Sequence, residues 1–94
     1  MSEKSFAFIK KDFDTLIDAI EFRRDWLSVK EGESQNRLIQ KLKESSNEVI
    51  SFVALTTEDI ELSIDALDFR YDNELAEEDL YHCVVMKEKL QEEA

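Results

Sequence analysis

The chain contains no proline, one glycine and one cysteine, and each scarcity limits what the protein can be. Without proline, and with Gly32 as the only glycine, few helices are interrupted and few turns need unusual backbone angles. These absences favour a mainly helical domain with short polar connections. Cys83 has no second cysteine with which to form an intrachain disulfide, which is typical of a reducing compartment.

Long apolar segments and sets of catalytic side chains are also absent. Residues 49–55 form the longest apolar run, too short to cross a bilayer, and the four apolar residues 6–9 are too few for a signal peptide. We therefore expect a soluble cytoplasmic protein. His82 is the only histidine, which excludes a credible Ser–His–Asp arrangement or a pair of Glu-x-x-His motifs. The sequence predicts no catalytic residue, metal or cofactor, and no enzyme.

Basic residues are scarce in the second half of the chain. Residues 57–94 carry thirteen acids and three bases, whereas residues 1–56 carry ten acids and nine bases. The net charge of −11 therefore comes almost entirely from the second half. Such a surface repels nucleic acid and anionic membrane, so we expect neither as a direct partner and expect a basic protein instead.

Apolar spacing and capping residues predict four helices in one domain, residues 1–94. The expected helices span residues 12–30, with Asp12 as cap, 34–45, from a cap within 56–59 to 73, and 76–92. We expect His82 on the surface and Cys83 in the core. The other core residues predicted are Phe13, Leu16, Ile17, Ile20, Leu27, Leu38, Leu42, Ile60, Ile64, Leu67, Tyr71, Leu80, Val84 and Leu90.

Residues 48–55, EVISFVAL, fit two structures. Their β-branched and aromatic side chains favour a strand, but apolar residues at helical spacing would also let the second helix continue. Residues 5–9, SFAFI, have the same character. The two segments can pair as a short ribbon, which is stable only if helices pack on it. The predicted fold class is mainly α, with this ribbon as an alternative to a longer helix.

The heptapeptide IDAIEFR at residues 17–23 returns as IDALDFR at residues 64–70, with five of seven positions identical. The likeness extends further, because residues 5–25 align with 51–72 after one insertion, and QKLKES (40–45) resembles EKLQEE (88–93). The pattern predicts an internal duplication in which pseudo-repeats 5–45 and 51–93 form two similar helical hairpins. The alternative is that amphipathic helices have converged in composition.

Two helices carry acids at positions i, i+4, i+7 and i+11, a spacing that places them on one face. The same helices carry a second apolar stripe, at residues 19, 22 and 26 and at residues 62, 66 and 69, which predicts burial between two neighbours or a homodimer interface. The residues proposed for a dimer or partner interface are Phe22, Trp26, Leu62 and Phe69. The predicted acidic surface comprises Asp14, Asp18, Glu21, Asp25, Glu58, Glu61, Asp65, Asp68, Asp72, Glu74, Glu77, Glu78 and Asp79.

Because of these acidic stripes, the chain resembles the DNA-mimic inhibitors that bacteriophages use against host defence. In size and charge it is similar to the anti-restriction nuclease proteins of T-even phages, and we expect it in the host cytoplasm if a phage encodes it. The resemblance implies an inhibitor whose carboxylates stand in for DNA phosphates and block a restriction endonuclease or a similar DNA-binding protein.

Two alternatives stay open. One is an immunity- or antitoxin-type protein that neutralises a basic toxin or nuclease through a compact hot spot at Trp26, Phe22 or Tyr71. The other is a structural or assembly helper whose acids only keep it soluble.

Overall fold

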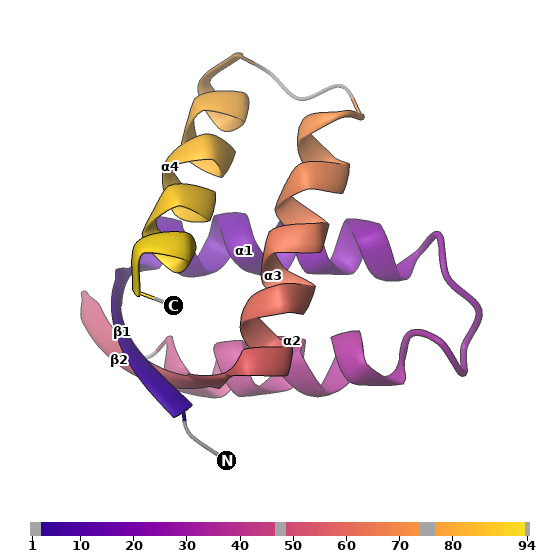
Figure 1. The fold of residues 1–94 in the computed structure, drawn as a ribbon, viewed down its shortest axis with the longest axis horizontal. Coiled ribbons are helices and arrows are strands. Elements are labelled where there is room, and N and C mark those ends of the chain that lie inside the picture. The colour runs from indigo at the N-terminus through magenta and orange to yellow at the C-terminus, as the bar shows by residue number, and fades with distance from the viewer. Residues whose placement is uncertain (1–2, 47–48, 74–76, 94) are drawn as a thin grey trace.

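The computed structural model describes residues 3–46, 49–73 and 77–93, and within them the order strand, helix, helix occurs twice (Figure 1). The mainly helical fold with a two-stranded antiparallel sheet agrees with the predicted fold class. The elements are β1 (Glu3–Ile9), α1 (Lys10–Arg24), α2 (Glu33–Ser45), β2 (Ile50–Thr56), α3 (Thr57–Tyr71) and α4 (Glu77–Glu93).

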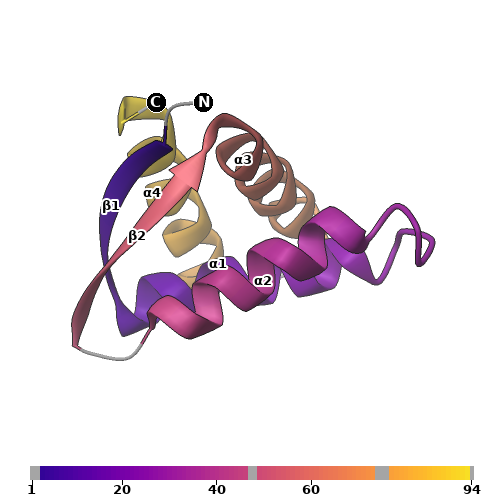
Figure 2. The ribbon, with the colours of Figure 1, turned by 90° about the horizontal axis from the view of Figure 1, so that it is seen from below.

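The ambiguous segment after α2 is a strand rather than a continuation of the helix. In the antiparallel register Phe6 lies opposite Val53 and Ile9 lies opposite Ile50. Alternate side chains of both strands are buried, and those between them, including Phe52, are exposed. Figure 2 shows the two strands side by side at one flank of the helices. The helices cover the inner face of the ribbon, which supplies the burial that an isolated ribbon lacks.

Both helices that follow a strand begin without a linker, because an aspartate in the first turn caps the junction. Asp12 Oδ2 accepts the Ile9 N–H at 3.1 Å, and Asp59 Oδ2 accepts the Thr56 N–H at 3.0 Å. The Thr56 hydroxyl in turn accepts the Asp59 N–H at 3.1 Å, which completes a capping box. The predicted start of the first helix at residue 12 was therefore two residues late, since Asp12 acts from within the first turn.

The first helix ends at Arg24, and its predicted extension to residue 30 is wrong. The Ser28 N–H donates to the Glu31 carboxylate at 3.2 Å, the Glu31 N–H donates to the Ser28 hydroxyl at 3.2 Å, and Gly32 N–H donates to Ser28 C=O at 2.9 Å. Hydrogen bonds from the side chain and the backbone N–H of Ser28 lower the pKa of the Glu31 carboxyl group. They offer the backbone a local alternative to the helix, and the chain turns here towards α2.

One hydrophobic core lies between the ribbon and the helices. Most of the predicted core residues of α1 to α3 are buried, but Tyr71 is 48% exposed. On α4 the buried side chains are Cys83, Met86 and Leu90, whereas Val84 is 38% exposed. The burial of Cys83 is confirmed and the predicted inward position of Val84 is wrong. The predicted inward positions and the observed buried positions both recur at helical spacing. Periodicity alone therefore did not determine which face of α4 turns towards the core.

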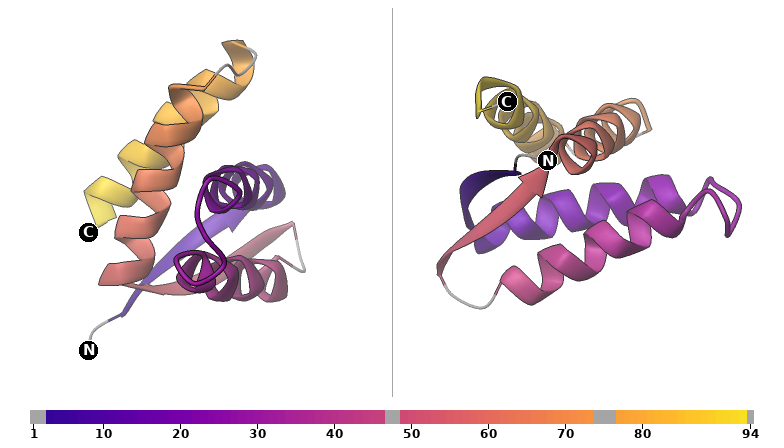
Figure 3. Two further views of the ribbon diagram at one scale, coloured as in Figure 1. Left: turned by 90° about the vertical axis from the view of Figure 1, so that its right-hand side faces the viewer. Right: turned by 60° about the horizontal axis from the view of Figure 1, so that its bottom comes forward.

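Two helix pairs cross each other, with α2 beside α1 and α4 beside α3 (Figures 1 and 3). Ala19 and Ala66 are completely buried, and each lies three residues before a phenylalanine, Phe22 or Phe69, whose rings meet 5.6 Å apart where α1 packs on α3. Small side chains at these positions allow the two helices to approach closely. The alanine in the second apolar stripe of each helix is thus buried by contacts within the same chain.

The repeated heptapeptide makes reciprocal contacts across this crossing. Arg23 Nε donates to Asp65 Oδ2 at 3.0 Å, and Arg70 Nε donates to Asp18 Oδ2 at 3.1 Å. Each guanidinium also lies over the phenylalanine of the other copy, with Arg23 4.5 Å from the Phe69 centroid and Arg70 4.2 Å from the Phe22 centroid. The two copies therefore bind each other through the same residues.

A second pair of reciprocal contacts joins the last helix of each half to the strand of the other half. Lys41 Nζ donates to Ala54 C=O at 3.1 Å and to Asp59 Oδ2 at 2.7 Å. Lys89 Nζ donates to Ala7 C=O at 2.6 Å and lies 3.8 Å from Asp12 Oδ2. These two lysines occupy the same place in the QKLKES and EKLQEE segments, so equivalent residues of the two halves make equivalent contacts.

Candidate protein-binding face

The acidic stripe of α1 is neutralised by bases of the chain itself. All four of its carboxylates lie within ion-pair distance of a lysine or arginine. The pairs are Asp14–Lys10 (3.8 Å), Asp18–Arg70 (3.1 Å), Glu21–Lys43 (3.6 Å) and Asp25–Arg24 (3.4 Å). A carboxylate with a close cation attracts a second cation less strongly, so this stripe carries less uncompensated negative charge than its acids alone would give.

The acidic stripe of α3 is neutralised only in part. Asp65 pairs with Arg23 at 3.0 Å and Asp68 pairs with Lys87 at 2.6 Å. Glu58, Glu61 and Asp72 are exposed and have no ion pair with any residue in the described part of the chain. Of the remaining predicted acids, Glu74 lies outside the described residues, as do the side chains of Glu77, Glu78 and Asp79.

The two halves of the molecule therefore share contacts but differ in charge. The three bases of residues 57–94 are Arg70, Lys87 and Lys89, and each contacts an acid, namely Asp18, Asp68 and Asp12 respectively. Among the described side chains of α3 and α4 and the residue that caps α3, five acids of this half are exposed and have no ion pair with a described residue: Glu58, Glu61, Asp72, Glu88 and Glu92. We call these two helices and their exposed acids the acidic hairpin.

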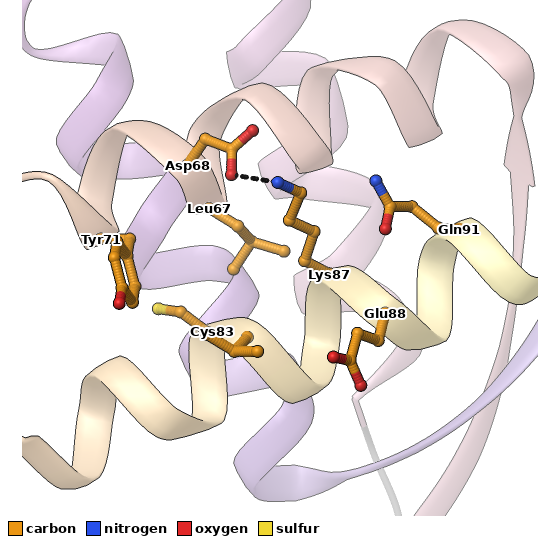
Figure 4. Close-up of a pocket in the computed structure, with 8 residues that line it drawn as sticks. Leu67, Asp68, Tyr71, Cys83, Lys87, Glu88 and Gln91 are labelled. Atoms are coloured by element: carbon orange, nitrogen blue, oxygen red, sulfur yellow. Dashed lines mark hydrogen bonds and ion pairs between the residues drawn. The ribbon is translucent and has the colours of Figure 1, made fainter.

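The acidic hairpin also contains a groove, which lies between its two helices and which we call the α3–α4 groove (Figure 4). Its volume is about 310 Å³. Leu67 and Cys83 at its base are buried, and Tyr71 and Val84 are partly exposed. The complete lining is Leu67, Asp68, Tyr71, Cys83, Val84, Lys87, Glu88 and Gln91.

The residues predicted to form a dimer or partner interface mostly pack within the chain. The rings of Phe22 and Phe69 lie 5.6 Å apart, and Trp26 lies 6.3 Å from Phe22 and 5.9 Å from Phe69. Phe22, Leu62 and Phe69 are half-buried, whereas Trp26 is 65% exposed. These intramolecular contacts account for the second apolar stripe without a second copy, and homodimerisation stays a prediction.

Asp12 and Asp59 are held at the strand-to-helix junctions by hydrogen bonds within the chain, so they add nothing to the exposed acidic surface. Burial raises the pKa of Asp59, but hydrogen bonds from Lys41 and Thr56 outweigh it and lower the pKa overall. The prediction that His82 lies on the open surface is wrong. Its side chain is 17% exposed, and its Nε2 lies 3.0 Å from Oδ1 of the buried Asp12. The likeness of QKLKES and EKLQEE signalled the equivalent lysines, but nothing in the sequence linked His82 to a residue seventy positions away.

Two further classes of site find no support in residues 3–46, 49–73 and 77–93. No group of three or more His, Cys, Asp or Glu side chains there could hold a metal ion. No helix in the same segments has the length and apolarity needed to cross a bilayer.

The best-defined surface features are thus the unpaired acids of the acidic hairpin, the α3–α4 groove and the exposed Trp26. Comparison of the chain with family models, with curated proteins and with solved structures gave no match.

Proposed function

We propose that this protein is an acidic protein-interaction inhibitor that acts as a DNA mimic and blocks the nucleic-acid groove of a basic DNA-binding protein. The acidic hairpin is the binding side. The observation that supports the proposal is that the two halves make equivalent contacts, yet only the second half carries exposed acids in excess of its bases. A restriction endonuclease or a similar host protein fits this description as the target.

The spacing of the α3 acids supports mimicry of a phosphate row. Two acids per two helical turns place one carboxylate every ~5 Å along the helix axis, counting Asp65 and Asp68, which also contact Arg23 and Lys87. Each DNA strand carries one phosphate per ~3.4 Å, which is of the same order. Lysines and arginines that line a DNA groove would meet these carboxylates through the same salt-dependent attraction that they use for DNA.

We also propose that the two halves derive from an internal duplication, with pseudo-repeats 5–45 and 51–93. The reciprocal Arg–Asp and Lys–Asp contacts support this, because each contact is repeated by the corresponding residues with the two halves exchanged. Charge has diverged between the halves where the fold does not depend on it. A permuted chain that begins with β2 should then fold as the native chain does.

The function is tested with two matched triple variants. One neutralises the unpaired acids of α3 (Glu58→Gln, Glu61→Gln, Asp72→Asn), and the other makes the same change of charge on the paired stripe of α1 (Asp14→Asn, Glu21→Gln, Asp25→Asn). A tagged chain first captures proteins from bacterial lysate. Duplex DNA then elutes those captured proteins whose nucleic-acid groove is blocked. The affinity of each variant for the eluted protein is measured at several salt concentrations.

We expect the α3 variant to bind its target at least ~10-fold more weakly and with a shallower dependence on salt, because three charge contacts are lost. The α1 variant should bind within about 3-fold of the native chain. Equal loss in both variants, or no loss in either, would refute the assignment to the acidic hairpin.

An immunity-type protein is the second candidate, and Trp26 is the observation that favours it. An exposed tryptophan resting on two phenylalanines is a typical anchor of a binding hot spot. If this candidate is correct, Trp26→Ala abolishes capture of a single protein that DNA does not elute. If Trp26→Ala has no effect on the captured protein, Trp26 is not the hot spot, and the observation that favours the immunity-type candidate is lost.

A further inference from the structure

The α3–α4 groove combines an apolar base with a charged rim, and this combination selects one kind of side chain. Leu67 and Cys83 supply the base, and the ring of Tyr71 stands at one end of it (Figure 4). Asp68 and Glu88 add carboxylates from the two helices. A side chain that fits must therefore have a long apolar stem and a cationic head.

Lys87 already meets these requirements from within the chain. Its side chain extends from α4 towards α3, and Nζ lies 2.6 Å from Oδ1 of Asp68 (Figure 4). Both groups remain open to solvent, since the side chain of Lys87 is 34% exposed and that of Asp68 is 52% exposed. An ion pair this exposed contributes little stability and is readily exchanged for another.

We propose that the α3–α4 groove receives an arginine side chain of the basic partner, which displaces Lys87 from Asp68. This inference rests on the proposed function, and it specifies the chemistry that the partner presents. The planar guanidinium binds a carboxylate through two parallel N–H···O bonds and stacks on an aromatic face, here that of Tyr71. Lysine cannot form the two parallel bonds, and its ammonium does not stack flat on a ring, so the groove prefers arginine.

Because the incoming arginine must displace Lys87, removing the positive charge of Lys87 should strengthen arginine binding at this site. Lys87→Gln leaves Asp68 without its internal partner and ready for the incoming guanidinium. Lys43→Gln is the matched control, because it makes the same change of charge on α2, where Lys43 lies 3.6 Å from Glu21 and 54% exposed. A general increase in negative charge would affect both variants equally.

The probe is the peptide acetyl-Gly-Arg-Arg-Gly-amide, with acetyl-Gly-Lys-Lys-Gly-amide for comparison. Binding to the ¹⁵N-labelled chain is followed through the backbone amide shifts. We expect the largest shifts within residues 67–71 and 83–91, and at least ~3-fold tighter binding of the arginine peptide than of the lysine peptide. Lys87→Gln should tighten binding of the arginine peptide by about 3-fold or more, and Lys43→Gln by less than 1.5-fold, on the order expected for exchange of an exposed pair.

Tyrosine variants test the stacking contact. Tyr71→Ser should remove most of the preference for arginine over lysine, whereas Tyr81→Ser, at an exposed tyrosine that does not line the groove, should keep it. Shifts spread over all acids of the molecule, or equal gains in Lys87→Gln and Lys43→Gln, would show general attraction only and overturn the proposal.

The proposed function and this inference fail separately. If the peptide experiment fails but neutralising Glu58, Glu61 and Asp72 still weakens binding of the DNA-eluted protein, only the proposed arginine site is refuted. If the captured protein is indifferent to those acids, the function itself falls.

Discussion

At the scale of single residues, Asp12 and Asp59 fix the two strand-to-helix junctions with different partners. Both accept the backbone N–H at the end of a strand, but Asp59 pairs with Lys41 at 2.7 Å, whereas Asp12 contacts His82 and, more distantly, Lys89. The hydrogen bonds that hold Asp59 lower its pKa despite burial. The junction before α3 therefore depends on an ionised carboxylate.

Replacing Asp59 by asparagine should destabilise the protein at neutral pH and matter less in acid. The pKa of Asp59 is lowered in the folded chain, so its contribution is complete above the unfolded value of about 3.9 and is lost as the pH falls through the folded value. We expect Asp59→Asn to lower the free energy of unfolding by about 1–2 kcal/mol at pH 7, by urea titration, with a smaller difference at pH 3. Asp14→Asn, at an exposed pair, should change it by less than about 0.5 kcal/mol. An Asp59→Asn effect of the same size at both pH values would show that ionisation plays no part.

Sequence reasoning placed residues with partners close in sequence more accurately than residues whose partners lie on other elements. Asp12 was assigned to the start of a helix because a cap acts on its own first turn. His82 was assigned to the surface because its partner lies on another element, and no spacing within one helix reveals such a contact. The ion pairs that neutralise the α1 stripe were missed in part for the same reason, since Arg70 and Lys43 come from other helices.

At the scale of helices and strands, the crossing of α1 and α3 depends on two alanines. Ala19 and Ala66 are completely buried, and larger side chains there would push the helices apart. The sequence predicted the second apolar stripe of each helix but left open whether a neighbour or a second copy covers it. Periodicity shows which face of a helix is apolar, and it does not identify what packs on that face.

Enlarging one of these alanines should destabilise the fold strongly. We expect Ala66→Leu to cost about 1–3 kcal/mol or more, because three added carbon atoms have no space between the helices. Ala54→Leu is the matched control, since Ala54 is exposed on the outer face of the ribbon, and it should stay within about 0.5 kcal/mol of the native protein. Thermal unfolding followed by circular dichroism measures both, and equal stability of the two variants would contradict the close approach of α1 and α3.

At the scale of the whole molecule, equivalent connections should be interchangeable if the two halves are equivalent. Four residues join the end of α2 at Ser45 to the start of β2 at Ile50. The corresponding positions are the end of α4 at Glu93 and the start of β1 at Glu3. A link of the same length between them consists of Ala94, one added glycine, Met1 and Ser2. A permuted chain that runs from residue 48 to 94, through this link, and on to residue 47 should therefore fold.

We expect the far-ultraviolet circular dichroism of the permuted chain to match that of the native chain, with a melting temperature within about 10 °C, a change of roughly 1–2 kcal/mol. A second permuted chain opened between the buried Leu38 and Ile39 should unfold, because the break falls inside a core helix. If both permuted chains fail, the two connections are not equivalent and the proposed duplication loses its main structural support.

The surplus of negative charge should make the stability of the molecule increase with salt. Ion pairs hold many acids, but the net charge of −11 means that repulsion exceeds attraction over the whole surface. At 0.2 M salt the screening length is below ~10 Å, so repulsion between the acids of α3 and α4 weakens. We expect the melting temperature to rise by several degrees between 10 mM and 200 mM NaCl, on the order of 1 kcal/mol.

The triple variant Glu58→Gln, Glu61→Gln, Asp72→Asn should start with a higher melting temperature at low salt and gain less from added NaCl, because its acidic hairpin repels itself less. The variant Asp14→Asn, Glu21→Gln, Asp25→Asn should show no such gain, since the acids it removes already have cationic partners. If salt lowers the melting temperature of the native chain, its ion pairs outweigh the repulsion. The acidic hairpin would then lack the uncompensated charge on which binding to a basic protein depends.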